Sequence, residues 1–162
     1  EEAMAAADGA FKAMGGRVYH VGNAPGAGST VKMINQLLVG VHVVAAAEAM
    51  ALATKAGADP QTVYDVITHG GGNSVVFESR VPYMLTEDYA PRGVVDIFIK
   101  DLGIVADAAR SLPFPLPMAT AALQQFLSAS ASGYGRSDDA SVVKVYEQIA
   151  GTNVAAAAKL KH

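Results

Sequence analysis

The amino-acid sequence predicts an all-α fold in which six or seven helices surround one long central helix. Alanine makes up about a fifth of the 162 residues, and this residue type favours helix over strand. The segment from Leu37 to Ala53 is almost continuously apolar. Glycine and proline divide the rest of the chain into segments of helical length. These three observations together indicate a helical bundle with a buried central helix.

The N-terminal part is predicted to hold a short helix and one strand. Residues 2–14 are rich in alanine and end at two consecutive glycines, which are typical of a helix C-terminus. Residues 17–21 alternate between polar and apolar side chains, which is the pattern of a strand. One strand alone cannot form a sheet, so this segment either pairs with a strand outside the chain or forms an extended linker. Residues 22–28 are predicted to be a linker.

The central helix is expected to begin at Ser29 or Thr30 as N-cap and to end near Ala56. Its middle is small or apolar on nearly every side, as in the central helix of a bundle or at a dimer interface. His42 and Glu48 interrupt the apolar run. Because an ionised glutamate is costly inside a bilayer, we predict a buried helix and no membrane span.

The remaining helices are predicted from their start and stop signals. Asp59 as N-cap and Pro60 at the first helical position begin a helix that reaches Thr68. Further helices are expected over 75–85, 96–111, 118–131 and 139–150, separated by segments rich in glycine and proline. The last residues, 152–162, are an alanine-rich run of low complexity, and we predict that they form a tail.

Composition excludes several classes of function. The chain has no cysteine, which excludes disulfides, thiolate catalysis and cysteine-zinc sites and agrees with a cytoplasmic protein. Its net charge of −3 argues against nucleic-acid binding. The four histidines show no metal-ligand spacing. Charged residues make up only 17%, so we expect surface to be covered by another subunit or domain. The chain begins with two glutamates rather than methionine, and we expect it to start within a longer protein.

Lys32, Asn35 and Gln36 form the first candidate site. They are spaced at i, i+3 and i+4 and therefore share one face of the predicted central helix. The positive end of the helix dipole disfavours a lysine ammonium in these first turns, so this lysine is suited to exchange a proton. Asn and Gln beside it can bind a hydroxyl or carboxylate. The simpler alternative is a solvated lysine beside two ordinary polar residues.

Lys100 and Asp101 form the second candidate site, near the start of a predicted helix and between apolar residues. Taken alone, they are equally consistent with a surface ion pair. The preceding glycine segment, Gly26-Ala27-Gly28, begins like a dinucleotide fingerprint but lacks its final glycine, because Val31 stands there. It is better explained as a loop that lets a helix start against a close neighbour.

Both segments resemble motifs of the β-hydroxyacid dehydrogenase family. Residues 26–35 resemble its catalytic segment, a Gly-x-Gly-x-x-x-Lys sequence followed by Asn, and residues 100–107 resemble its second C-terminal motif. About seventy residues separate the two lysines, as in that family. The resemblance extends over roughly residues 2–150.

The resemblance implies that this chain is the C-terminal half of such an enzyme, with the helical fold of the 6-phosphogluconate dehydrogenase C-terminal type. Residues 1–21 would then be the remnant of an N-terminal Rossmann domain, and 22–28 a linker. Residues 29–151 would form the catalytic and dimerisation domain, and 152–162 the tail. The fragment alone would be inactive, because the main cofactor site would lie in the other half.

The resemblance also implies roles for individual residues. Lys32 would be the general acid and base, and Asn35 and Gln36 would bind substrate. Lys100 and Asp101 would lie at the cofactor, near its nicotinamide. No metal is implied. Many members carry two asparagines where this chain has Asn and Gln, which leaves the role of Gln36 open.

The expected reaction is oxidation of a small hydroxy acid with NAD. NADP stays open, since the residue that reads the ribose would lie in the other half. Residues 68–74 and 133–139 are most similar to family members that act on L-threonate. The alternative reactions are the reduction of tartronate semialdehyde and the oxidation of 3-hydroxyisobutyrate. A homodimer or higher homo-oligomer is expected. The alternative of another class is a non-catalytic helical dimerisation module.

Overall fold

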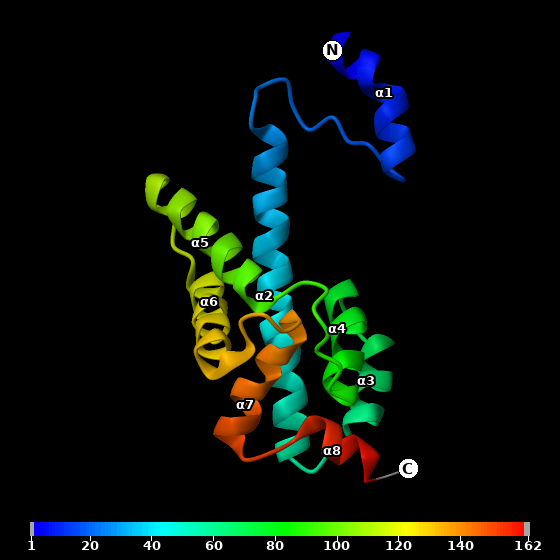
Figure 1. The fold of residues 1–162 in the computed structure, drawn as a ribbon, viewed down its shortest axis with the longest axis vertical. Helices are drawn as coiled ribbons and strands as arrows, with labels where there is room; N and C mark the ends of the chain where they lie inside the picture. Colours follow the sequence, from blue (N-terminus) through cyan, green and yellow to red (C-terminus); the bar gives the residue numbers. More distant parts are fainter. Residues whose placement is uncertain (1, 161–162) are drawn as a thin grey trace. The chain divides into compact units, whose positions relative to one another are not determined.

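A computed structural model of the chain describes residues 2–160 and is built from helices (Figure 1). No β-strand occurs within this described range, where Val94 and Asp138 form a single isolated antiparallel bridge. The all-α prediction is therefore confirmed. The α-helices are α1 (Glu2–Met14), α2 (Ala27–Lys55), α3 (Pro60–Thr68), α4 (Val75–Thr86), α5 (Val95–Ser111), α6 (Pro117–Ala129), α7 (Val143–Ala150) and α8 (Val154–Lys159).

The chain divides into two compact units, one ending at Asn35 and the other beginning at Gln36. The N-terminal unit holds α1, an irregular segment and the first turns of α2. The strand predicted over 17–21 is wrong, because these residues have irregular conformation. A strand needs a neighbour to bond its backbone N–H and C=O groups, and no segment within residues 2–160 supplies one.

Helix α2 begins at Ala27, so the predicted N-caps, Ser29 and Thr30, both lie inside the helix. Gly26 adopts a φ of +94° there, and its carbonyl accepts a hydrogen bond from the Thr30 amide at 3.0 Å. By length and composition alone α2 could cross a membrane. Buried core helices meet the same criterion, and the second half of α2 is such a helix. Its buried residues are Gly40, Val43, Val44, Ala46, Ala47, Met50 and Ala51.

In the C-terminal unit, α2 runs through the middle of the bundle, with α3 and α4 on one side and α5 and α6 on the other (Figure 1). Stacked rings join each pair. Phe98 and Phe126 lie 4.9 Å apart between α5 and α6, and Tyr64 and Phe77 lie 6.0 Å apart between α3 and α4. The helices predicted from Asp59 onward are all present, and a 3-10 turn at Asp139–Val142 leads directly into α7.

The tail predicted over 152–162 differs from the structure. Within the described residues of 152–162, α8 is a folded helix that packs against α3 and α4, with Val154 and Ala155 completely buried. Asn153 caps it by accepting the Ala156 amide, and the Glu147 carboxylate accepts the Val154 amide at 2.7 Å. The alanine-rich run is therefore packed against the rest of the bundle. Residues 161–162 lie outside the described range.

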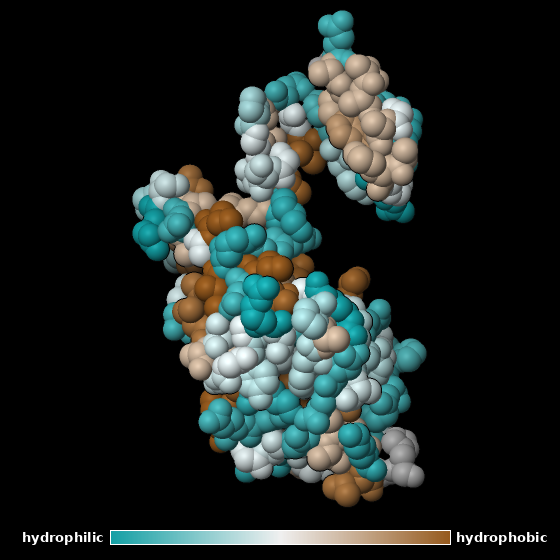
Figure 2. Space-filling model, viewed as in Figure 1, coloured by the Kyte–Doolittle hydropathy of each residue, from teal (hydrophilic) through white to brown (hydrophobic). Residues whose placement is uncertain are grey.

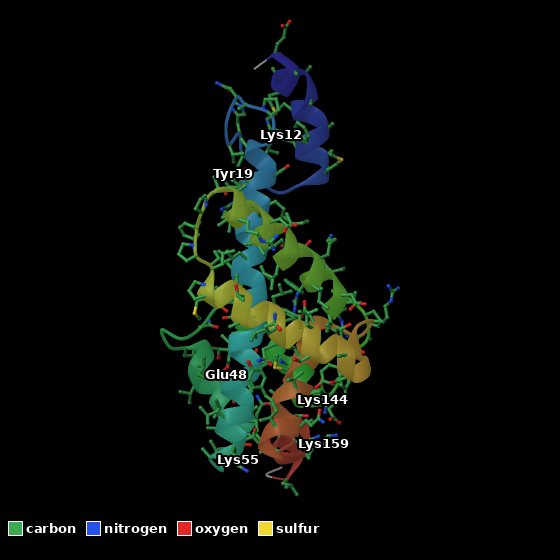
Figure 3. The ribbon with its side chains drawn as sticks, turned by 90° about the vertical axis from the view of Figure 1, so that its left-hand side faces the viewer. Lys12, Tyr19, Glu48, Lys55, Lys144 and Lys159 are labelled. Carbon is green, nitrogen blue, oxygen red and sulfur yellow. The ribbon has the colours of Figure 1, made fainter. Side chains whose placement is uncertain are left out.

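Charged side chains connect the ends of helices in this unit, and Figure 3 labels two of them, Lys55 and Lys144. Lys55 at the end of α2 donates to the Ala150 carbonyl at the end of α7, with 2.8 Å between the atoms. Lys144 on α7 pairs with Glu87 at the end of α4 and with Glu147 on its own helix. These contacts fix α7 against α2 and α4, and they position Glu147 to cap α8.

Candidate functional site

The five residues predicted to form the site lie on two helices. Lys32, Asn35 and Gln36 belong to α2, which is unbroken over this range, so they keep the helical spacing on which the prediction rested. Lys32 and Asn35 fall in the N-terminal unit, and Gln36 begins the C-terminal unit. Lys100 and Asp101 lie in α5, in the C-terminal unit.

The structure brings Gln36, Asp101 and Lys100 together, although 65 residues separate the first two. The Gln36 amide nitrogen Nε2 donates to Asp101 Oδ2 at 2.7 Å. The other carboxylate oxygen, Oδ1, lies 3.1 Å from Lys100 Nζ. The Asp101 side chain is only 14% exposed, whereas that of Lys100 is 67% exposed. We call these three residues the Gln36–Asp101–Lys100 cluster.

Gly40 explains why α2 and α5 come close enough for this cluster to form. It lies one helical turn after Gln36, and a Cβ atom at this position would be 3.2 Å from both terminal carbons of Leu102 and from the Phe98 ring. Leu102 and Phe98 flank Asp101 on α5. A side chain at Gly40 would therefore push away the part of α5 that carries Asp101.

The start of α5 is fixed by the segment that precedes α7. Val94 offers no side-chain cap, and the first amides of the helix bond to backbone instead: Val95 donates to the Ser137 carbonyl and Asp96 to that of Gly135, both at 3.1 Å. Ser130 Oγ also donates to Asp96 at 2.8 Å. The first amides of a helix have no acceptor within the helix. Here they bond α5 to a part of the chain that is distant in sequence.

A buried ion pair lies beside the loop that leads into α5. Arg80 Nε donates to Asp139 Oδ1 at 2.8 Å and Nη2 to Oδ2 at 3.3 Å. The Asp139 side chain is fully buried, and its amide donates to the Gly93 carbonyl. Burial raises the pKa of Asp139 to about 6, and the Arg80 guanidinium opposes that rise. Sequence reasoning missed this pair, because 59 residues separate its members.

The histidines of the described range do not form a metal centre. Residues 2–160 contain no group of three or more His, Cys, Asp or Glu that could hold a metal ion. His69 Nδ1 lies 2.8 Å from the Asp65 carbonyl of its own helix. His42 lines a hollow of about 380 Å³ between α2, α3 and the start of α4, together with Asn73 and Ser74. No pattern in the sequence predicts this hollow.

The chemistry of the cluster fits a cofactor that carries anionic and carboxamide groups. Lys100 presents an exposed side chain whose ammonium pairs with the mostly buried carboxylate of Asp101. An ammonium pairs with a pyrophosphate oxygen or donates to a carboxamide oxygen, and a nicotinamide dinucleotide has both. The exposed ammonium of Lys100 therefore suits such a cofactor.

Comparison with known proteins identifies the region that contains both motifs. Residues 26–146 match a family described as NAD-binding of NADP-dependent 3-hydroxyisobutyrate dehydrogenase. An L-threonate dehydrogenase of Cupriavidus necator is 55% identical over 148 residues, which cover 91% of this chain and 50% of that protein. A 2-(hydroxymethyl)glutarate dehydrogenase of Eubacterium barkeri is 37% identical over 142 residues, covering 87% and 47%. The chain spans about half the length of the curated relatives it matches.

Solved structures show the same fold. A crystal structure of 3-hydroxyisobutyrate dehydrogenase from Salmonella typhimurium superimposes with a TM-score of 0.87 at 53% identity, over 90% of this chain and 51% of that one. The Mycobacterium tuberculosis 3-hydroxyisobutyrate dehydrogenase with L-serine gives a TM-score of 0.80 at 27% identity, over 90% and 52%.

Proposed function

The chain belongs to the family of NAD-binding domains of 3-hydroxyisobutyrate dehydrogenases, and from that premise we propose that it supplies the proton-transfer and positioning residues of an enzyme that oxidises a small hydroxy acid. The observation that carries the proposal is the bond between Gln36 and Asp101. It joins the helix of the first lysine motif to the helix of the second, and both motifs lie inside the matched region 26–146.

In the proposed reaction, Lys32 Nζ takes the proton of the substrate hydroxyl as the carbon–oxygen double bond forms. The bound nicotinamide supplies the acceptor for the hydride that leaves the same carbon. Asn35, three residues later on α2, donates to the substrate and keeps its hydroxyl toward the amine. In the reverse direction the Lys32 ammonium returns the proton to the carbonyl oxygen. Lys100 binds the cofactor at its nicotinamide end, with Asp101 as its fixed partner.

L-threonate is the proposed substrate. The relatives at 50–55% identity are named L-threonate dehydrogenases, and each is about twice as long as the region shared with this chain. Tartronate semialdehyde and 3-hydroxyisobutyrate are the alternatives. Turnover of the full-length protein decides between them: L-threonate and 3-hydroxyisobutyrate are tested with NAD or NADP, and tartronate semialdehyde with NADH or NADPH.

The decisive variant for the reaction is Lys32→Met in the full-length protein. Loss of a general acid and base lowers turnover by roughly 10²–10⁴-fold, and we expect NADH to bind as before. Lys12→Met is the matched control, since Lys12 is an exposed lysine of α1 that pairs with Asp8. Turnover of Lys32→Met equal to that of the control would remove Lys32 from the mechanism.

A second copy of the chain is the proposed protein partner, and the outer face of α2 is its proposed contact. Leu38 and Leu52 are 49% and 66% exposed there, with Ala45 midway between them, and Figure 2 shows hydrophobic residues reaching the surface of this unit. If two copies of α2 cross antiparallel at Ala45, Leu38 lies against Leu52 of the partner copy and His42 against its Glu48. The face is thus self-complementary, as a two-fold interface requires.

The same face would also serve a non-catalytic dimerisation module. The two functions differ in Lys32, which a purely structural module does not need. A protein that dimerises but shows no turnover with any of the three acids would support the structural module.

A further inference from the structure

We propose that Gln36 is a positioning residue that holds Asp101 and, through Asp101, fixes the ammonium of Lys100. This differs from the substrate-binding role that the family resemblance implies for Gln36. The inference rests on the proposed function, because that function gives Lys100 its role at the cofactor.

The first step of the argument is the division of one carboxylate between two donors. Asp101 Oδ2 accepts from Gln36 at 2.7 Å, and Oδ1 pairs with Lys100 at 3.1 Å. Hydrogen bonds to a carboxylate are stronger than neutral ones, and this one lies at the short end of the usual range. If the carboxylate rotated to follow a moving lysine, it would lose the bond to Gln36. Gln36 therefore restricts the orientation of Asp101.

The second step concerns the geometry of α5. Lys100 and Asp101 are consecutive, and consecutive side chains on a helix point in directions about 100° apart. Helix geometry alone therefore does not hold the Lys100 side chain, which is 67% exposed, beside that of Asp101. A lysine side chain also loses about 2 kcal/mol of rotamer entropy when it is ordered. A carboxylate bonded to another helix gives this lysine a fixed partner, and so α2 sets the position of an ammonium on α5.

The third step concerns the length and charge of the side chain. Close packing of Gly40 against Leu102 and Phe98 sets the separation of α2 and α5, so the helices cannot approach further to accommodate a shorter group. Asparagine is one methylene shorter than glutamine and would leave Asp101 without this bond. Glutamate has the right length but would place a second carboxylate against the first. Of asparagine, glutamate and glutamine, only glutamine has both the length to reach Asp101 and no negative charge.

A cycle of variants in the full-length protein separates positioning from substrate binding. The proteins are wild type, Gln36→Ala, Lys100→Met and the double variant, assayed with L-threonate and NAD. We expect Gln36→Ala to lower kcat/KM by roughly 10- to 100-fold, the loss that corresponds to one hydrogen bond to a charged group, with the change mainly in the KM for NAD. If Gln36 acts through Lys100, the double variant loses no more than Lys100→Met alone. If Gln36 binds substrate, the two losses multiply, and the proposal is wrong.

A second measurement needs neither substrate nor cofactor. In the same protein labelled with ¹³C-lysine, the Lys100 Cε resonance is identified by its loss in Lys100→Met. We expect this resonance to shift in Gln36→Ala and in Gln36→Asn. Gln61→Ala is the matched control, because it removes an exposed Gln–Asp bond of 3.0 Å, to Asp65 on α3, and should leave Lys100 unchanged.

The two measurements distinguish failure of this inference from failure of the proposed function. A wild-type protein that turns over none of the acids would overturn the proposed function, while the Lys100 resonance would still report on the cluster. A Lys100 resonance that is identical in wild type and Gln36→Ala would overturn the positioning role, whatever the turnover. A fall in melting temperature with unchanged kinetics and an unchanged resonance would mean that Gln36 only stabilises the fold, which also contradicts the proposal.

Discussion

Arg80→Met tests how much the buried ion pair beside α5 contributes to stability. The substitution keeps most of the aliphatic stem and removes the guanidinium, which leaves the fully buried Asp139 without its ionic partner. Breaking a buried pair by removing one member costs about 3–5 kcal/mol. Arg80 itself is 27% exposed, so water can partly replace it. We therefore expect a loss of about 3 kcal/mol in the free energy of unfolding near neutral pH.

The loss should depend on pH in a defined direction. Burial raises the pKa of Asp139 from 3.8 to about 6, so between these values the folded protein holds a proton that the unfolded chain releases. The stability from that proton is complete below the unfolded pKa and disappears as the pH rises through about 6. Arg80 lowers the pKa of Asp139. In Arg80→Met the pKa of Asp139 in the folded protein is therefore higher, and the free energy of unfolding continues to fall with pH up to that higher value. Each further pKa unit corresponds to about 1.4 kcal/mol.

The assay is urea unfolding of wild type and Arg80→Met at about pH 8 and about pH 5. We expect the deficit of the variant to shrink at the lower pH by roughly 1–2 kcal/mol, since Asp139 is then protonated in both proteins. Arg110→Met is the control, because Arg110 pairs with Asp107 on the surface, where both side chains are more than 70% exposed. It should change stability by less than about 0.5 kcal/mol. Adding Asp139→Asn to Arg80→Met should restore part of the loss. A deficit that is equal at both pH values would refute the reasoning.

Three further predictions follow from other contacts. Gly40→Ala should lower stability by about 1–3 kcal/mol, measured by thermal unfolding, because its Cβ would press on Leu102 and Phe98; an unchanged melting temperature would contradict this. Glu147→Ala leaves the Val154 amide without its acceptor, so hydrogen exchange over 154–158 should accelerate by a factor that corresponds to about 1–3 kcal/mol, and unchanged protection there would show that the cap contributes nothing. Ala45→Arg should convert a dimer to monomer in sedimentation, and a wild type that is already monomeric at micromolar concentration would refute the proposed interface.

The helices could be predicted because their signals are local. Asp59 and Pro60 mark the start of α3 within two residues, and the Asp59 carboxylate does accept the Thr62 amide. The same logic applies to Ser74 before α4, whose hydroxyl accepts the Phe77 amide. Asn153 is a third cap of this kind, but the alanine run after it obscures the signal, because alanine has no pattern of apolar and polar faces. The run is nevertheless buried, since small side chains allow α8 to pack closely.

The interactions of the candidate site could not be predicted in the same way. The spacing of Lys32, Asn35 and Gln36 is a property of one helix and is visible in the sequence. The partner of Gln36 lies 65 residues away, and the partner of Arg80 lies 59 residues away. Such pairs depend on how helices pack, which side-chain periodicity does not specify. Gly40 was a visible clue, because a glycine inside a long helix costs stability and is typical of a close approach.

The polar contacts of α5 are concentrated where a functional helix needs them. Apolar packing against α6 is not directional, so by itself it leaves the rotation and register of α5 poorly defined. Hydrogen bonds are directional. At Val95 and Asp96 they join α5 to the segment before α7, and at Asp101 they join it to α2. Two such places one and a half turns apart define both the rotation and the translation of the helix between them. Lys100 lies within this interval. The contacts that determine the position of α5 therefore also determine the point from which the Lys100 side chain extends.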